Sequence, residues 1–260
     1  MSYTIGIDIG STSTKTAVLA QDGTAVLLFV QPTGWSSVDT AEAVRRQLIR
    51  EGYDPAVYPC VATGYGRIAV PFADKAVTEI TCHALGASYL HGGQDLTVID
   101  IGGQDTKIIR VVDERVMDFM MNDKCSAGTG RFLEIMANTM GLRPDELCEL
   151  ASLGGGVSIS SMCTVFAESE VISLIGRGES RENIAFAVVD SIVKKVASQA
   201  SHLEAGSTVC LTGGLCQCSY LLQALRTALK REIVASDNGR YAGAIGAALT
   251  ARGVAKEEQA

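Results

Sequence analysis

The sequence predicts an α/β protein made of two similar lobes, and three observations support this fold class. The motif I-D-I-G-x-x-x-T-K occurs twice, once around Asp8 and once around Asp100. Each copy contains short runs of alternating apolar and polar residues, which are typical of strands joined by tight turns. Each set of strands is followed by segments with helical periodicity. An internal duplication of this kind indicates two related structural units.

The first copy predicts a three-stranded meander. Alternation begins the chain, and the letters QDG at Gln21–Gly23 indicate a hairpin turn between the second and third strands. Two helical segments follow. The expected strands are Tyr3–Ile9, Lys15–Ala20 and Ala25–Val30, and the expected helices are about Thr40–Arg50 and Thr78–Leu90.

The second copy predicts the same meander, with a turn near Asp113–Arg115. Its expected strands are Leu96–Ile101, Thr106–Val112 and Val116–Met120. Several helical segments follow, so the second unit is expected to be the larger.

The turn after the first strand of each copy has the residues of a phosphate-binding loop. Gly10 in the first copy, and Gly102 with Gly103 in the second, let the backbone approach a ligand and expose N–H groups. Asp8 and Asp100 stand just before these turns and suit a hydrated Mg²⁺ ion. One such turn is an ordinary hairpin, whereas two retained copies favour nucleotide binding. The glycine that precedes the lysine of a Walker A loop is absent.

A third glycine turn follows the strand-like run TVCLTGGLCQ at Thr208–Gln217, and the small-residue helix YAGAIGAAL at Tyr241–Leu249 comes near the end. This combination resembles the actin, Hsp70 and sugar-kinase superfamily, whose lobes are ribonuclease H-like. The resemblance implies ATP with Mg²⁺ in a cleft between two lobes. The first lobe is expected over 1–92, completed by the C-terminal helix 241–260, and the second over 93–240.

Composition excludes several other classes. Apolar residues make up 47% and charged residues 20%, and the net charge of −7 gives no reason to expect nucleic acid or an anionic membrane. We expect no signal peptide and no membrane span, hence a cytoplasmic protein. In a reducing compartment the eight cysteines are core residues, ligands or reactive thiols rather than disulfides.

Cys125 and Cys163 differ from the other cysteines because each is expected immediately before an amphipathic helix. Helix N-termini stabilise thiolates and anionic metal–sulfur clusters. Two thiolates are half of the four that a common cluster takes, so a two-fold dimer would supply the rest. Spacing alone nevertheless favours buried structural cysteines. The expected apolar helix faces are Phe132, Leu133, Met136 and Met140 in the first helix, and Val165, Val171, Ile172 and Ile175 in the second.

The segments NDKCSAGTGRFLE and SSMCTVFAESEVIS resemble the cluster motifs of the activator ATPases of 2-hydroxyacyl-CoA dehydratases, relatives of the ATPase subunits of benzoyl-CoA reductase. ATGYGR, TEITCHALGAS and DIGGQDTKII also match that family, over nearly the whole chain. The resemblance implies a homodimer bridged by one oxygen-sensitive [4Fe–4S] cluster. It implies ATP-driven, low-potential electron transfer to an iron–sulfur dehydratase or a double-cubane cluster protein, with ferredoxin or flavodoxin as donor.

Carried onto this chain, the resemblance assigns roles to residues. Cys125 and Cys163 become the cluster ligands, and Asp8 and Asp100 hold Mg²⁺. Gln104 and Asp105 are the candidates for orienting the attacking water. Arg240 stands where relatives often carry Gln, which leaves the adenine contacts there open. The remaining nucleotide-binding residues are Gly10, Ser11, Thr12, Ser13, Thr14 and Lys15 in the first loop, Gly102 and Gly103 in the second, and Gly213, Gly214 and Gln217 at the adenosine.

Two other functions fit the sequence less well. A small-molecule kinase of the same superfamily would need an acceptor pocket, for which the chain is short. A nucleotide-switched binding protein would carry only structural cysteines. Core packing is expected for Cys60, Cys82, Cys148 and Cys210. No ligand set is evident for Cys216 and Cys218. Glu79 and His83 are expected to form a pair within one helix.

Overall fold

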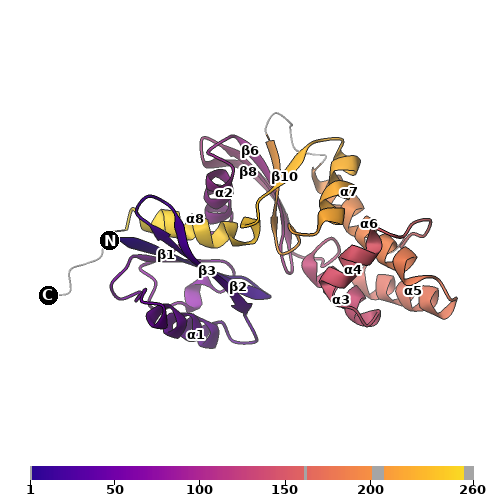
Figure 1. The fold of residues 1–260 in the computed structure, drawn as a ribbon, viewed down its shortest axis with the longest axis horizontal. Helices are drawn as coiled ribbons and strands as arrows, with labels where there is room; N and C mark the ends of the chain where they lie inside the picture. The colour runs from indigo at the N-terminus through magenta and orange to yellow at the C-terminus, as the bar shows by residue number, and fades with distance from the viewer. Residues whose placement is uncertain (1, 161–162, 201–207, 255–260) are drawn as a thin grey trace. The chain divides into compact units, whose positions relative to one another are not determined.

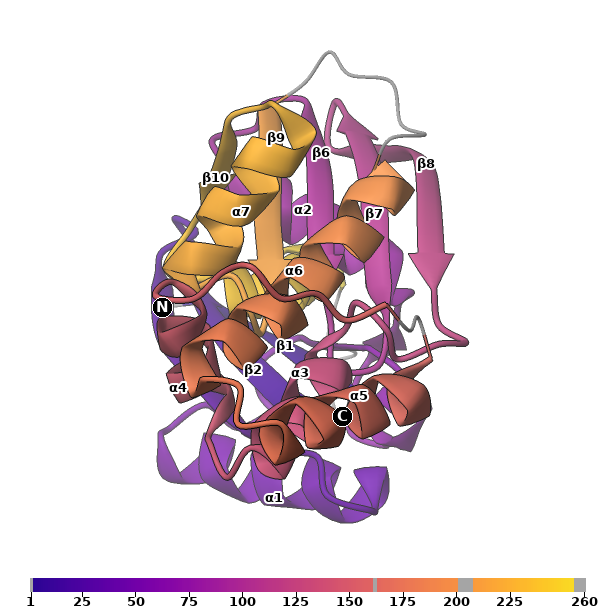
Figure 2. The same ribbon diagram turned by 90° about the vertical axis from the view of Figure 1, so that its right-hand side faces the viewer.

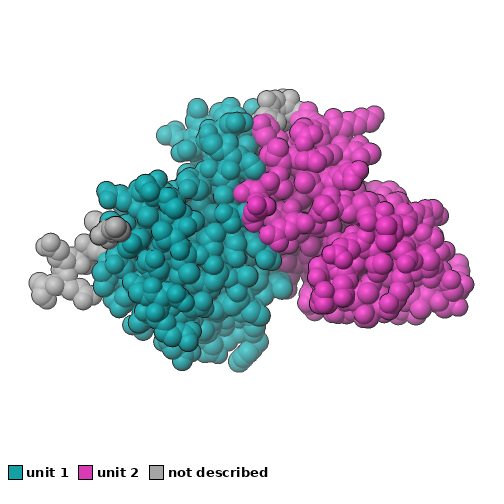
Figure 3. All heavy atoms as spheres, in the orientation of Figure 1, with its two compact units in different colours: residues 1–96, 110–118, 238–260 teal, residues 97–109, 119–237 magenta. Residues whose placement is uncertain are grey.

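The computed structural model of the protein describes residues 2–160, 163–200 and 208–254. These residues fall into two compact units, coloured separately in Figure 3. Unit 1 comprises residues 1–96, 110–118 and 238–260, and unit 2 comprises 97–109 and 119–237. The boundary therefore passes through three strands, β6 (Leu96–Ile101), β7 (Thr106–Val112) and β8 (Arg115–Asn122).

Unit 1 contains a five-stranded sheet with the order β3-β2-β1-β4-β5. β1 pairs antiparallel with β2, and β2 with β3, so the first meander predicted from sequence is confirmed. β4 runs parallel to β1. The strands are β1 (Tyr3–Ile9), β2 (Ser13–Ala20), β3 (Ala25–Pro32), β4 (Cys60–Thr63) and β5 (Lys75–Ala76).

Helices cover both faces of this sheet (Figure 1). α1 (Ser37–Arg50) packs its Val44 and Leu48 against Ile5 and Ile7 of β1. α8 (Ala242–Ala251) packs on the other face, and α2 (Glu79–Leu90) packs on α8. Short 3₁₀ turns lie at η1 (Arg67–Ala69) and η2 (Gly239–Tyr241). Ser36 and Thr78 begin α1 and α2 by accepting hydrogen bonds from the N–H groups of Asp39 and Thr81.

The small residues of α8 are explained by how closely it approaches its neighbours. A Cβ atom on Gly6 of β1 would overlap the carbonyl oxygen of Ala244. At the α2–α8 crossing, a Cβ on Gly246 would likewise overlap the carbonyl oxygen of Cys82. Larger side chains at these positions would force the elements apart.

Unit 2 is built on a second five-stranded sheet, with the order β10-β9-β6-β7-β8. β9 and β10 are parallel, and Asp113 and Glu114 both adopt positive φ in the turn that joins β7 to β8. The second predicted meander is thus confirmed. The strands are β6 (Leu96–Ile101), β7 (Thr106–Val112), β8 (Arg115–Asn122), β9 (Thr208–Gly213) and β10 (Ile233–Ala235).

Five helices accompany this sheet among the described residues. Figure 2 shows α6 and α7 lying across strands β9, β6 and β7. The unit's main apolar core joins side chains of β6, β7 and β9 to buried side chains of all five helices. The helices are α3 (Gly130–Thr139), α4 (Pro144–Ala151), α5 (Thr164–Gly176), α6 (Arg181–Ala200) and α7 (Ser219–Leu229). None of the helices in the described ranges has the length and apolar character needed to cross a bilayer.

Candidate nucleotide site and cysteine pair

The first predicted phosphate loop is the turn between β1 and β2 in unit 1. Asp8 and Lys15 are direct cross-strand partners, with 3.9 Å between Lys15 Nζ and Asp8 Oδ2. Asp8 is 2% exposed, whereas Ser11, Thr12 and Ser13 are accessible. The turn thus offers hydroxyl and N–H groups at the surface above a buried carboxylate.

Thr33, just beyond β3, holds this turn in place. Its hydroxyl donates to the Gly10 carbonyl oxygen at 2.8 Å, and its N–H donates to the Thr12 carbonyl oxygen at 3.0 Å. Thr14 is fully buried, and its hydroxyl lies 2.9 Å from that of Thr33. Of the residues assigned to this loop, Thr14 therefore faces inward and supports the turn.

The second predicted phosphate loop joins β6 to β7 in unit 2 and contains a buried lysine. Lys107 Nζ lies 2.7 Å from Asp105 Oδ2 and 3.3 Å from Asp100 Oδ2. All three residues are at most 3% exposed. Thr212 donates its hydroxyl to Asp100 Oδ1 at 3.0 Å. One buried cation thus balances part of the charge of two carboxylates, as burial of charge requires.

The third predicted turn, after β9, lies against this second loop. Gly213 has φ +89°, and a Cβ there would overlap the carbonyl oxygen of Ile101 at the end of β6. Asp100 and Gly213 are thereby brought together within unit 2. Gln217 is exposed and donates to the Asp237 carbonyl oxygen at 3.3 Å. Arg240 is half-buried in η2 of unit 1.

The second loop is hydrogen-bonded to the beginning of α3. The N–H groups of Gly130 and Arg131 donate to the carbonyl oxygens of Gly102 and Gly103 at 2.9 and 2.8 Å. Thr106, buried in β7, donates its hydroxyl to the Gly128 carbonyl oxygen at 2.7 Å. The segment that follows Cys125 is therefore fixed directly to a predicted phosphate loop.

Cys125 and Cys163 are both exposed and both belong to unit 2. Cys163 is the N-cap residue of α5, as predicted. Cys125 does not immediately precede its helix, because α3 begins only at Gly130, after Gly128 has turned the chain with φ +82°. The hydroxyls of Ser126 and Thr164, the residues that follow the two cysteines, lie 2.7 Å apart.

The two predicted apolar faces behave differently. The face of α3 is buried, as expected, and Gly141 has φ +66° just after the helix. The face of α5 is wrongly predicted in part, because only Val171 is buried. Exposed apolar side chains of α5 are Val165, Phe166, Ile172 and Ile175.

Cys60, Cys82, Cys148 and Cys210 are buried, as expected, and Cys216 is buried too, whereas Cys218 is partly exposed. Burial raises the pKa of Cys82 to about 11 and that of Cys210 to about 12. Cys218, the N-cap of α7, accepts a hydrogen bond from the Cys148 thiol, which lowers the pKa of Cys218 and raises that of Cys148.

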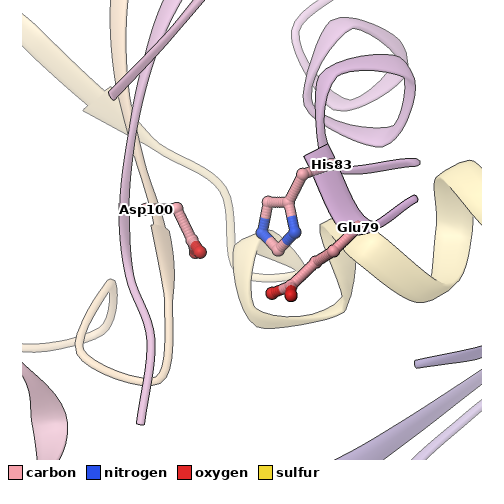
Figure 4. Close-up of side chains that lie close together, drawn as sticks. All are labelled: Glu79, His83 and Asp100. Carbon is pink, nitrogen blue, oxygen red and sulfur yellow. The ribbon is translucent and has the colours of Figure 1, made fainter. Parts of the chain in front are cut away.

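Glu79 and His83 project from the same side of α2 (Figure 4), and Asp100, labelled in the same view, belongs to unit 2. The intrahelical pair expected of Glu79 and His83 stays a prediction.

These turns and sheets define an α/β chain of the actin-like and sugar-kinase fold class. A ROK family glucokinase from Streptomyces griseus, solved with glucose and AMPPNP, shares the fold with a TM-score of 0.62 at 16% identity, over 96% of this chain and 99% of that chain. The protein belongs to the BadF/BadG/BcrA/BcrD ATPase family, whose pattern matches residues 5–251. The fold class and the family predicted from sequence are confirmed.

Two relatives of the family are similar over nearly their whole length. The (R)-2-hydroxyglutaryl-CoA dehydratase activating ATPase of Acidaminococcus fermentans is 41% identical over 254 residues, which cover 96% of each chain. The activator of the 2-hydroxyisocaproyl-CoA dehydratase from Clostridium difficile, solved with bound ADPNP, matches with a TM-score of 0.89 at 36% identity, over 96% of this chain and 94% of that chain.

Two features of the site were missed by sequence reasoning. Lys107 carried a signal, because it occupies the same place in the second repeat as Lys15 does in the first. The Ser126–Thr164 hydrogen bond had only a weak signal, a hydroxyl residue after each of the two cysteines.

Proposed function

We propose that this protein is an ATP-dependent donor of low-potential electrons. In this proposal a homodimer, bridged by one [4Fe–4S] cluster, couples ATP hydrolysis to one-electron reduction of a partner iron–sulfur protein. The partner is a 2-hydroxyacyl-CoA dehydratase or a double-cubane cluster protein. A ferredoxin or flavodoxin is the electron donor that reduces this protein again. The observation that carries the proposal is the pair of exposed cysteines in unit 2, which are linked through the hydroxyls of Ser126 and Thr164. The chain that follows Cys125 is hydrogen-bonded to a predicted phosphate loop at Gly130 and Arg131.

ATP would be held by the three glycine turns. The accessible hydroxyls of Ser11, Thr12 and Ser13, with Lys15, suit the phosphates at the first turn, and Gly102 and Gly103 suit them at the second. The buried carboxylates Asp8 and Asp100 are chemically suited to hold Mg²⁺ directly or through its water. The adenosine would lie at Gly213, Gly214, Gln217 and Arg240, and Gly10 and Thr14 shape the first turn.

Gln104 is the better candidate for positioning the attacking water. Its side chain is exposed, whereas Asp105 is 3% exposed and pairs with Lys107 at 2.7 Å. In the proposed hydrolysis, water attacks the γ-phosphorus, the bond to the ADP oxygen breaks, and a proton leaves with the phosphate or to solvent. Asp105 would then act by fixing Lys107 and the loop.

The chain's cysteines fit a shared [4Fe–4S] cluster in number and exposure. Cys125 and Cys163 supply two thiolates per chain, so two chains supply the four that such a cluster takes. Val165, Phe166 and Ile172 of α5, the helix that Cys163 caps, are exposed apolar side chains of the kind that a partner chain covers. When bound, the cluster would accept and release single electrons.

The proposed link between nucleotide and cysteines runs through unit 2. A shift of Gly102 and Gly103 on phosphate binding would move Gly130 and Arg131, which are hydrogen-bonded to them. The loop from Cys125 to Thr129 connects these residues to β8 and would move with α3. Nucleotide state would thereby alter the surroundings of the cysteines and their exposure to the electron acceptor.

Iron and sulfide analysis of anaerobically purified protein tests the proposal. We expect about two irons per chain, a broad visible absorption that bleaches with dithionite, and loss of both in Cys125→Ser and Cys163→Ser. Cys60→Ala, which changes a buried cysteine of β4, is the control and should retain the iron.

Colourless, iron-free protein after anaerobic reconstitution would overturn the electron-transfer proposal. Phosphate transfer from ATP to a sugar or a carboxylic acid would then identify a kinase. ATP hydrolysis without transfer would identify a nucleotide-switched binding protein.

A further inference from the structure

The two exposed cysteines of unit 2 are each followed by a hydroxyl residue, and these two residues meet. Ser126 Oγ and Thr164 Oγ1 lie 2.7 Å apart in a partly buried position. Beneath this contact Thr129 and Ala167 are fully buried. The hydrogen bond thus joins the Cys125 loop to the first residue of α5 at the boundary between the exposed thiols and the core.

The Cys125 side of this contact is held by further hydrogen bonds. Asn122 Nδ2 donates to the carbonyl oxygens of Cys125 at 2.9 Å and of Ala127 at 3.3 Å. Thr129 donates its hydroxyl to the Ser126 carbonyl oxygen at 2.6 Å. Hydrogen bonds therefore hold the backbone at residues 125–127, and Ser126 connects this segment to α5.

The Cys163 side is held by the helix that it caps. Ala167 N–H donates to the Cys163 carbonyl oxygen at 2.9 Å in the first turn of α5. Thr164 is the first residue of that helix, so its backbone is held by the helix. A bond between Ser126 and Thr164 consequently fixes the spacing of the two residues that precede them.

We propose that Ser126 and Thr164 are positioning residues, which hold Cys125 and Cys163 together as a preformed two-thiolate half-site for a metal–sulfur group. The inference rests on the proposed function, because it takes these cysteines as ligands. In a preformed half-site the two cysteines are already ordered, so binding costs less conformational entropy than it would if they lay on independent loops. Outer partners that orient metal ligands typically change metal retention by about 10–100-fold when they are removed.

Iron loss from the anaerobically prepared protein tests the pair. We expect Ser126→Ala and Thr164→Val to release iron to a ferrous chelator at least about tenfold faster than the parent. The electron paramagnetic resonance spectrum of the reduced protein should also change. The conservative variants Ser126→Thr and Thr164→Ser keep a hydroxyl and should restore slow release, which a loss of fold would not allow.

A matched control lies on the same pair of helices. Thr139 at the end of α3 donates its hydroxyl to Glu168 of α5 at 3.0 Å. Thr139→Val removes a hydrogen bond between α3 and α5 without touching the cysteine segments. It should lower the thermal midpoint as much as Thr164→Val does, yet leave iron release unchanged. The proposal would be overturned if Ser126→Ala and Thr164→Val released iron at the rate of the parent. It would also be overturned if Thr139→Val accelerated iron release as much as those two variants do.

Cadmium binding to iron-free protein separates the two proposals. Cd²⁺ titration followed by the thiolate charge-transfer absorption reports on the cysteine pair whether or not iron is its physiological occupant. If the parent never takes up iron but Ser126→Ala weakens Cd²⁺ binding about tenfold, the positioning pair stands and the electron-donor function fails. If Cd²⁺ binds Ser126→Ala, Thr164→Val and the parent equally, the positioning pair is overturned.

Discussion

Asp8 and Lys15 face each other across the first hairpin, with 3.9 Å between Lys15 Nζ and Asp8 Oδ2. The second hairpin repeats this relationship between Asp100 and Lys107, at 3.3 Å. A hairpin places residues at this offset opposite each other, which explains why the repeat preserves both letters, D and K. In each unit the repeated aspartate is therefore paired with the repeated lysine.

The repeated threonine has a comparable part in both copies. Thr14 and Thr106 are buried, and each uses its hydroxyl to hold the chain beside its turn. The contact of Thr14 is with Thr33, whereas Thr106 contacts Gly128 in the Cys125 loop. The same motif thus supports an ordinary strand end in unit 1 and the cysteine segment in unit 2.

Replacing Lys107 by Met should destabilise unit 2 strongly. The substitution leaves Asp100 and Asp105 buried without the cation that balances them, and removing one partner of a buried ion pair costs about 3–5 kcal/mol. Urea unfolding followed by circular dichroism measures the change. Lys194→Met is the control, because Lys194 pairs with Asp190 at 2.7 Å while 66% exposed and should cost less than about 1 kcal/mol.

The strands could be predicted from sequence because alternation and turn residues determine them locally. β1, β6 and β7 have the predicted bounds, and β2, β3 and β8 differ by a few residues. Local patterns do not reveal which apolar residues remain uncovered. Ile172 and Val171 are neighbours of equal apolar character, yet Ile172 is 56% exposed and Val171 is buried. That difference depends on which elements pack against α5.

The beginning of α3 shows a second limit of sequence reasoning. Cys125 precedes an apolar helical pattern, but the glycines at 128 and 130 allow a turn and a close approach that delay the helix. A Cβ on Gly130 would lie 3.1 Å from the Gly102 carbonyl oxygen. Only the tertiary contact with the second phosphate loop explains why the helix begins there.

Cys218 should be alkylated at lower pH than its hydrogen-bonded neighbour. The Cys148 thiol donates to Cys218 and lowers its pKa, so Cys218 holds more reactive thiolate near neutral pH. Brief iodoacetamide treatment followed by peptide mass spectrometry should label Cys218 well before Cys148. In Cys148→Ala that hydrogen bond is absent, so the pH at which the labelling rate of Cys218 reaches half of its maximum should be higher. Equal labelling of the two thiols would contradict this assignment.

Alkaline pH should weaken the fold through buried thiols. The pKa of Cys82 rises from its usual 9.0 to about 11 because the thiol is buried. A raised pKa contributes stability that is complete below about pH 9 and is lost as the pH rises through the folded pKa. One such thiol lowers the unfolding free energy by about 1.4 kcal/mol at pH 10, because only the unfolded chain ionises there.

Urea midpoints at pH 8 and pH 10 check this effect. Cys82→Ala removes one of the buried thiols, so its loss of stability between the two pH values should be smaller than that of the parent by about 1 kcal/mol. Lysine and tyrosine ionisation contributes equally to both proteins and cancels in the difference. An identical pH dependence would show that Cys82 ionises with its ordinary pKa in the folded chain.

Adding one methyl group at Gly246 should destabilise unit 1, although alanine favours helices. A Cβ there would overlap the carbonyl oxygen of Cys82 on α2, where both contacting groups belong to rigid helix backbones. The two helices would have to separate, and overpacking of this kind typically costs about 1–3 kcal/mol. Thermal unfolding of Gly246→Ala should show a lower midpoint than the parent.

Gly176→Ala provides the matched comparison, because Gly176 ends α5 and nothing lies within 4 Å of the position its Cβ would take. Alanine at such an open helical site gains up to about 1 kcal/mol of helix propensity. We therefore expect opposite signs, a fall in midpoint for Gly246→Ala and no change or a rise for Gly176→Ala. A neutral Gly246→Ala would mean that α2 and α8 separate at little cost, and that the small residues of α8 serve something other than close packing.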